Sequence, residues 1–66
     1  MEYAKFSLAS ARVNAGLSQK KAAEELNISN TTLCNWENYK SYPDAEMISK
    51  ICALYGIHYD QIKFCP

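Results

Sequence analysis

The chain has 66 residues, of which 48% are hydrophobic, and its seven basic residues balance seven acidic ones to a formal net charge of zero. This length predicts one small domain over residues 1–66 and leaves little room for a large catalytic cleft. The zero net charge counts against nucleic acid as a partner, because domains that bind it are usually basic.

Targeting signals and metal-site spacings are not found in the sequence. No apolar run is long enough for a membrane span, and "MEYAKFSLAS" lacks the pattern of a signal peptide, so we expect a cytoplasmic protein without a membrane partner. Cys34, Cys52 and Cys65 lack CxxC spacing and are interpreted as buried or incidental thiols. With a single histidine, no metal, cofactor or small-molecule ligand is expected.

The first predicted helix covers residues 4–15 and ends before Gly16, which suits a left-handed cap. Its inward face is expected to hold four residues at helical spacing: Ala4, Leu8, Ala11 and Ala15.

Two further helices are joined by a turn of three or four residues. Ser18 caps the second, "QKKAAEEL", and Asn27 follows where that helix must stop. Ser29 then caps a third helix that runs to about Asn38. So short a turn predicts a steep crossing of the two helices.

A fourth helix begins after Pro43 and Asp44 and ends at Gly56, with Ile48, Ile51, Cys52 and Tyr55 facing inward. His58 and Gln61 have the spacing of a capping box, which predicts a fifth helical turn at "YDQI". No segment alternates with the period of two that a half-buried strand needs. The predicted fold is therefore an all-α bundle of five short helices without a sheet.

The third helix has two chemically different sides. Leu33 and Trp36 lie on one side of a helical wheel, and the polar side carries Asn30, Thr31, Thr32, Cys34 and Asn35. Asparagine can bind adenine through two hydrogen bonds, and threonine can contact phosphate or the thymine methyl group. The alternative interpretation is an ordinary solvated polar face.

A longer pattern carries more information. The residues "RxxxGLSQxxxAxxLNISxxTLxxWExxxxxP" from Arg12 to Pro43, continued by "ISKICALYGIHYDQI", closely resemble the Cro/phage-repressor-like (XRE-type) helix-turn-helix family. The resemblance implies a lambda-repressor-like DNA-binding domain whose third helix enters the major groove.

The resemblance also implies roles for single residues. The base-reading positions are Asn30, Thr31 and Asn35, and the phosphate-contacting positions are Gln19, Ser29, Thr32, Asn38, Tyr39 and Lys40. Arg12 and Glu37 are expected to form a structural ion pair.

The sequence departs from the family pattern at three places. Tyr39 stands where relatives often have a glycine with positive φ, so either the loop differs locally or the tyrosine contacts a sugar-phosphate strand. Ala22 and Tyr55 replace a larger aliphatic residue and a leucine, and the two changes are expected to compensate in volume. Positive charge near the third helix is limited to Lys20, Lys21 and Lys40, partly offset by Glu24 and Glu25.

So little positive charge predicts weak binding by one domain. We therefore expect a homodimer on a double-stranded, (pseudo)palindromic DNA operator. Its interface would draw on the region that contains Met47, Leu54, Tyr59, Ile62 and Phe64.

An enzyme built on Cys52 or Cys34 with His58 and Asp60 is a poor alternative, because no oxyanion device, phosphate loop or room for a pocket is evident. The same fold used as a protein-interaction or antitoxin-like module is the main alternative, although such a groove should carry large apolar anchors on the third helix. The sequence thus predicts a small transcriptional regulator, of the repressor and phage or mobile-element type, with no effector domain. The role of Cys34 stays open between a thymine contact, an oxidation-sensitive thiol and a neutral position.

Overall fold

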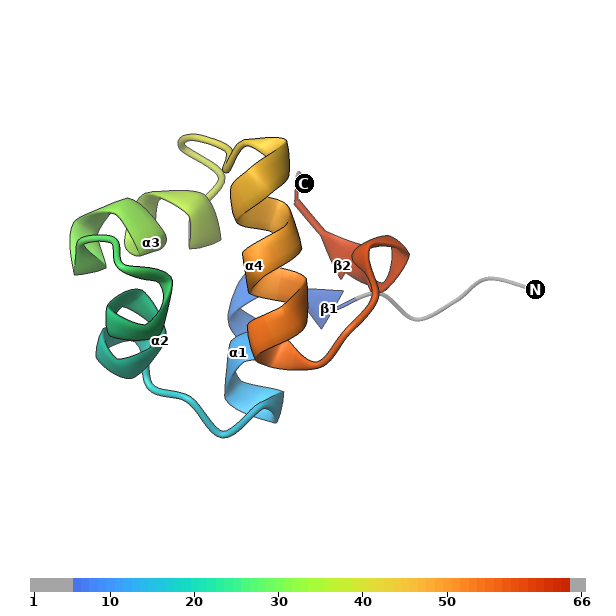
Figure 1. Ribbon diagram of the computed structural model, residues 1–66. Coiled ribbons are helices and arrows are strands. Elements are labelled where there is room, and N and C mark those ends of the chain that lie inside the picture. The colour runs from blue at the N-terminus through green and yellow to red at the C-terminus, as the bar shows by residue number, and fades with distance from the viewer. Residues whose placement is uncertain (1–5, 65–66) are drawn as a thin grey trace.

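The computed structural model describes residues 6–64 of the chain. Its elements in chain order are β1 (Phe6–Ser7), α1 (Leu8–Asn14), α2 (Gln19–Leu26), α3 (Asn30–Glu37), α4 (Ala45–Tyr55), the 3-10 helix η1 (Tyr59–Gln61) and β2 (Ile62–Lys63). Figure 1 shows α4 in the middle of the molecule, with α2 and α3 on one side and the two strands on the other. The α2–turn–α3 unit therefore forms one end of the fold.

All four α-helices begin in the same way. An N-cap residue with extended backbone, Ser7, Ser18, Ser29 or Asp44, accepts a hydrogen bond through its side chain from the backbone N–H three residues later. Each cap satisfies one of the amide groups that a helix N-terminus leaves without an intrahelical partner. The predicted caps at Ser18, Ser29 and Asp44 are confirmed.

The same four helices also end in one way. Each is followed by a residue with positive φ: Gly16 (77°), Asn27 (60°), Tyr39 (61°) and Gly56 (66°). The next residue then donates its backbone N–H to a carbonyl five positions earlier, from Leu17, Ile28, Lys40 and Ile57 to Arg12, Ala23, Asn35 and Cys52. This is the Schellman arrangement, and it satisfies carbonyl groups that the helix end would otherwise leave free.

The prediction for the first helix was wrong at its N-terminal end. Helix α1 begins at Leu8, because Ser7 caps it and residues 6–7 are extended. Ala4 lies outside the described residues. Ala15 is exposed just beyond the helix end, so of the three predicted inward residues that the structure describes, Leu8 and Ala11 are in the core.

The absence of a sheet was also predicted wrongly. Strands β1 and β2 pair in parallel, with Phe6 opposite Ile62 and Ser7 opposite Lys63. The described residues contain four α-helices rather than five, and the predicted fifth turn is the 3-10 helix η1, in which Gln61 accepts a hydrogen bond from the backbone N–H of His58 at 3.1 Å. Two-residue strands are too short to show an alternating pattern, so periodicity could not reveal them.

The core lies between the four α-helices and β2. Its buried residues are Leu8, Ala11, Ala22, Ala23, Leu26, Leu33, Ile51, Tyr55 and Ile62. Ala22 and Tyr55, a small and a large residue, are both buried in this one cluster. No helix among residues 6–64 has the length and apolar character needed to span a membrane.

Candidate nucleic-acid interface

Helix α3 is seated by its apolar side and presents its polar side. Leu33 is fully buried, and Trp36 packs against the core while partly exposed. On the other side Asn30 and Thr31 are exposed, and Cys34 and Asn35 are half-buried. Glu37 at the C-terminal end is the one charged residue of α3, and its side chain points inward. The outer surface of α3 therefore presents amide, hydroxyl and thiol groups.

Glu37 pairs with Arg12 across the fold. The Nε atom of Arg12 lies 2.8 Å from Oε2 of Glu37, and the two side chains are 14% and 6% exposed. Arg12 also donates through Nη1 to the carbonyl oxygen of Leu17 at 2.8 Å. These contacts join α1 to the end of α3 and to the α1–α2 turn, so the position of α3 depends on a charge that is largely removed from water.

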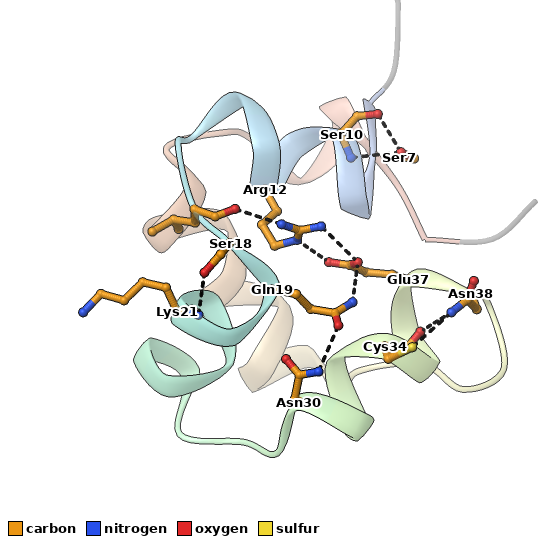
Figure 2. A network of polar contacts seen from close by, with 11 residues as sticks. Ser7, Ser10, Arg12, Ser18, Gln19, Lys21, Asn30, Cys34, Glu37 and Asn38 are labelled. Atoms are coloured by element: carbon orange, nitrogen blue, oxygen red, sulfur yellow. Dashed lines mark hydrogen bonds and ion pairs between the residues drawn. The ribbon is translucent and has the colours of Figure 1, made fainter.

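Gln19, which the resemblance assigns to a phosphate, has two protein partners. Its Nε2 donates to Oε1 of Glu37 at 3.0 Å, and its Oε1 accepts from Nδ2 of Asn30 at 3.0 Å. Figure 2 shows the resulting series of contacts from Arg12 through Glu37 and Gln19 to Asn30. The first residue of α2 is therefore bound to the first residue of α3.

Sequence reasoning missed this bridge because it assigned Glu37 a single cation. A carboxylate has two oxygens that accept several hydrogen bonds, and Arg12 uses part of its own capacity on Leu17. The burial of this carboxylate and its closeness to Gln19 are properties of the fold, so no local signal in the sequence marked the bridge.

Ser29 and Thr32 form the N-terminal cap of α3. The Ser29 hydroxyl accepts from the backbone N–H of Thr32 at 3.1 Å and lies 2.8 Å from the Thr32 hydroxyl. Ser29 is exposed and Thr32 is half-buried. Both hydroxyls thus lie at the start of α3, beside Asn30.

The loop after α3 keeps the geometry of a glycine loop although a tyrosine is present. Tyr39 adopts a φ of 61°, and its N–H bonds to the carbonyl oxygen of Trp36 at 3.2 Å. Asn38 donates from Nδ2 to the Cys34 carbonyl oxygen at 2.9 Å and lies 3.3 Å from the Cys34 sulfur. The local difference considered for this loop is therefore not found, and Tyr39 keeps the positive φ.

Charge around this surface is sparse. Lys20 and Lys40 are exposed, whereas Nζ of Lys21 lies 3.2 Å from Oε2 of Glu25 on the same helix. Within residues 6–64, no carboxylate lies within ion-pair distance of Lys20 or Lys40.

A separate groove of about 430 Å³ lies between α4 and η1, which corrects the expectation that no pocket of this size exists. Its lining includes Cys52 and His58 but not Asp60. Burial raises the pKa of the Cys52 thiol, which disfavours the thiolate that a nucleophile needs. Cys65 lies outside the described residues.

The proposed dimer region is less exposed than its composition suggests. Ile62 is a core residue, and Met47, Leu54 and Phe64 pack partly against the core. Tyr59 is 62% exposed and stacks on Phe64, with ring centroids 5.7 Å apart.

Comparison with known proteins agrees with this architecture. The family model described as "Helix-turn-helix" matches residues 8–62. The HTH-type transcriptional regulator ImmR of Bacillus subtilis (strain 168) is 42% identical over 55 residues, which cover 83% of this chain and 43% of that protein. The chain thus spans less than half the length of this relative, and no solved structure matches. The matched region contains α1 to α4 in full, and this chain belongs to the XRE-type helix-turn-helix family.

Proposed function

We propose that this chain binds double-stranded DNA in a sequence-specific manner as the DNA-binding domain of a transcriptional regulator, with α3 in the major groove. The polar outer side of α3 is the observation that carries this proposal. The large exposed hydrophobic residues of the described chain, Phe6, Val13, Tyr42 and Tyr59, all lie outside α3. A helix that binds a protein groove would present such anchors, whereas short amide and hydroxyl groups suit base edges.

The contact between Gln19 and Asn30 supports a phosphate-facing edge beside that helix. It brings the N-termini of α2 and α3 together, so the positive ends of two helix dipoles lie at one edge of the surface. Free backbone amide groups at such ends favour phosphate oxygens. We assign contacts with the sugar-phosphate backbone of DNA to this edge and to the loop over residues 38–40.

The three proposed base-reading residues differ in exposure. Asn30 and Thr31 are exposed at the start of α3, and Asn35 is half-buried one turn further along. Phosphate contacts fix the position of a domain on DNA, while base contacts give its sequence preference. We therefore expect the preference to depend on α3 and the general affinity to depend on the lysines and helix ends.

The name of the Bacillus relative describes a transcriptional regulator, which supports this function for the part of the chain that is shared. We further propose that two copies bind a (pseudo)palindromic operator, because one small surface with few free cations neutralises few phosphates.

Selection of bound sequences from random DNA tests the proposal. The wild-type chain should enrich a motif, and Asn30→Ala and Asn35→Ala should each lose preference at a different position by about tenfold. Ser49→Ala on α4, an exposed residue outside the proposed interface, is the matched control and should keep the wild-type motif. A chain that enriches no motif, or asparagine variants with unchanged base preference, would rule out this assignment.

A further inference from the structure

The series of contacts from Arg12 to Asn30 runs from the interior to the proposed DNA surface. Its inner member, Glu37, is 6% exposed in its side chain, Gln19 is half-buried, and Asn30 is exposed. Each link is short: 2.8 Å from Arg12 to Glu37, 3.0 Å from Gln19 to Glu37, and 3.0 Å from Asn30 to Gln19.

The negative charge of Glu37, at the inner end of the series, determines which group donates and which accepts in every hydrogen bond that follows. An ionised carboxylate only accepts, so Gln19 must turn its NH₂ group toward Glu37. Its carbonyl oxygen then lies at the opposite end of the amide and also only accepts. Asn30 must therefore donate through Nδ2, which leaves its carbonyl oxygen and one N–H for another partner.

An acceptor beside a single donor matches adenine, whose major-groove edge offers the N6 amino group as donor and N7 as acceptor. In the opposite orientation, Asn30 would accept from Gln19 and turn both N–H bonds outward. Two donors would suit guanine, which offers two acceptors, O6 and N7.

We propose that Glu37, held by Arg12, acts through Gln19 as a positioning residue that orients Asn30 and so makes adenine preferred over guanine at the base that Asn30 contacts. This inference rests on the proposed function. It gives the ion pair a role in specificity that is separate from its role in holding α1 against α3.

The decisive variant is Gln19→Met, which keeps the length of the side chain and the buried ion pair but removes both amide groups. The position read by Asn30 is first identified as the one at which Asn30→Ala loses base preference. Affinity is then measured for operators that carry adenine or guanine there. We expect the ratio of the two affinities to fall by about tenfold in Gln19→Met. A general loss of phosphate contact cancels in this ratio.

Asn35 provides the internal control, because among residues 6–64 the side-chain hydrogen bonds of Gln19 run to Glu37 and Asn30 and not to Asn35. Base preference at the position read by Asn35 should stay unchanged in Gln19→Met. In the free protein, the side-chain amide proton resonances of Asn30 should shift in Gln19→Met while those of Asn35 stay in place. Circular dichroism shows whether Glu37→Gln is folded. The folded variant should lower the ratio of adenine-operator affinity to guanine-operator affinity in the same way.

The outcomes separate this inference from the proposed function. If the wild-type chain enriches no motif, both are wrong. If Asn30→Ala loses base preference but Gln19→Met keeps the adenine-to-guanine ratio within about twofold, the DNA-binding assignment stands and the positioning role of Glu37 is overturned.

Discussion

Tyr39 shows at the scale of one residue that a backbone conformation suited to glycine can be kept by a tyrosine. The Schellman ends of α1, α2 and α4 use Gly16, Asn27 and Gly56, which tolerate positive φ at low cost. The end of α3 uses a tyrosine instead, whose Cβ atom makes the same conformation unfavourable. A costly conformation that persists beside a proposed binding surface points to a role for the ring or hydroxyl in binding.

Replacing Tyr39 should therefore separate backbone strain from side-chain contacts. We expect Tyr39→Gly to be more stable than Tyr39→Ala by about 1 kcal/mol, because both remove the ring and only glycine relieves the positive φ. Urea unfolding at constant m-value measures this difference. Both variants should bind operator DNA more weakly than the wild type. Equal midpoints for the glycine and alanine variants would show that the loop conformation costs nothing.

Tyr55 is the second residue that lowers the free energy of unfolding in its native position. The ring lies in the core at 7% exposure, and its hydroxyl has no hydrogen-bond partner among the described residues. Burial, and to a lesser extent the negative charge of Glu37, raise the pKa of Tyr55 to about 12, although Arg12 partly opposes the shift. The hydroxyl is thus held neutral beside the ion pair that anchors α3.

Removing this hydroxyl should stabilise the fold, and increasingly so at high pH. We expect Tyr55→Phe to raise the free energy of unfolding by about 1 kcal/mol near neutral pH, since an unpaired buried hydroxyl is lost. The folded pKa of about 12 exceeds the ordinary value of 10, so the wild type loses stability as the pH rises from 10 toward 12, and the variant lacks this loss.

The measurement is urea unfolding of both proteins at about pH 8 and about pH 11, where the advantage of Tyr55→Phe should grow by roughly 1 kcal/mol. Tyr42→Phe is the matched control, because the Tyr42 ring is 62% exposed. An advantage that stays constant with pH, or a destabilised Tyr55→Phe, would contradict the unpaired hydroxyl.

At the scale of elements, the sequence was informative wherever local chemistry decides the structure. The caps at Ser18, Ser29 and Asp44, the left-handed Asn27 and the capping interaction of Gln61 all depend on neighbours within a few residues. The parallel pairing of β1 with β2 depends on opposite ends of the chain, and nothing local to either strand marks it. The start of α1 was misplaced for this reason.

The candidate site shows the same division. The two sides of α3 follow from helical spacing, and the resemblance indicated which residues would form the ion pair; Arg12 and Glu37 lie 2.8 Å apart. The orientation of Gln19 and Asn30 could not be read in this way, because it depends on how a buried carboxylate shares its oxygens between donors from α1 and α2, and on the hydrogen bond that Asn30 then donates to Gln19.

At the scale of the whole molecule, the balance of charge limits what one copy can do. Lys20, Lys40 and the partly neutralised Lys21 are the cations nearest the proposed surface. Ile62, which the sequence suggested for a dimer contact, is buried in the core. Each neutralised phosphate contributes about −0.9 to the slope of log affinity against log salt. Three lysines therefore predict a slope near −3 for one domain on one half-site.

If two copies bind a palindromic operator, this slope should roughly double to between about −5 and −6, and sedimentation should find two chains per operator but one per half-site. Lys20→Gln should make the slope shallower by about 1 for each bound copy, because Lys20 is exposed and free of a carboxylate within residues 6–64. Lys50→Gln on α4, where Lys50 lies 3.7 Å from Glu46, should leave the slope unchanged. One chain per full operator would exclude the symmetric dimer, and equal effects of the two lysine variants would place the DNA on a different face.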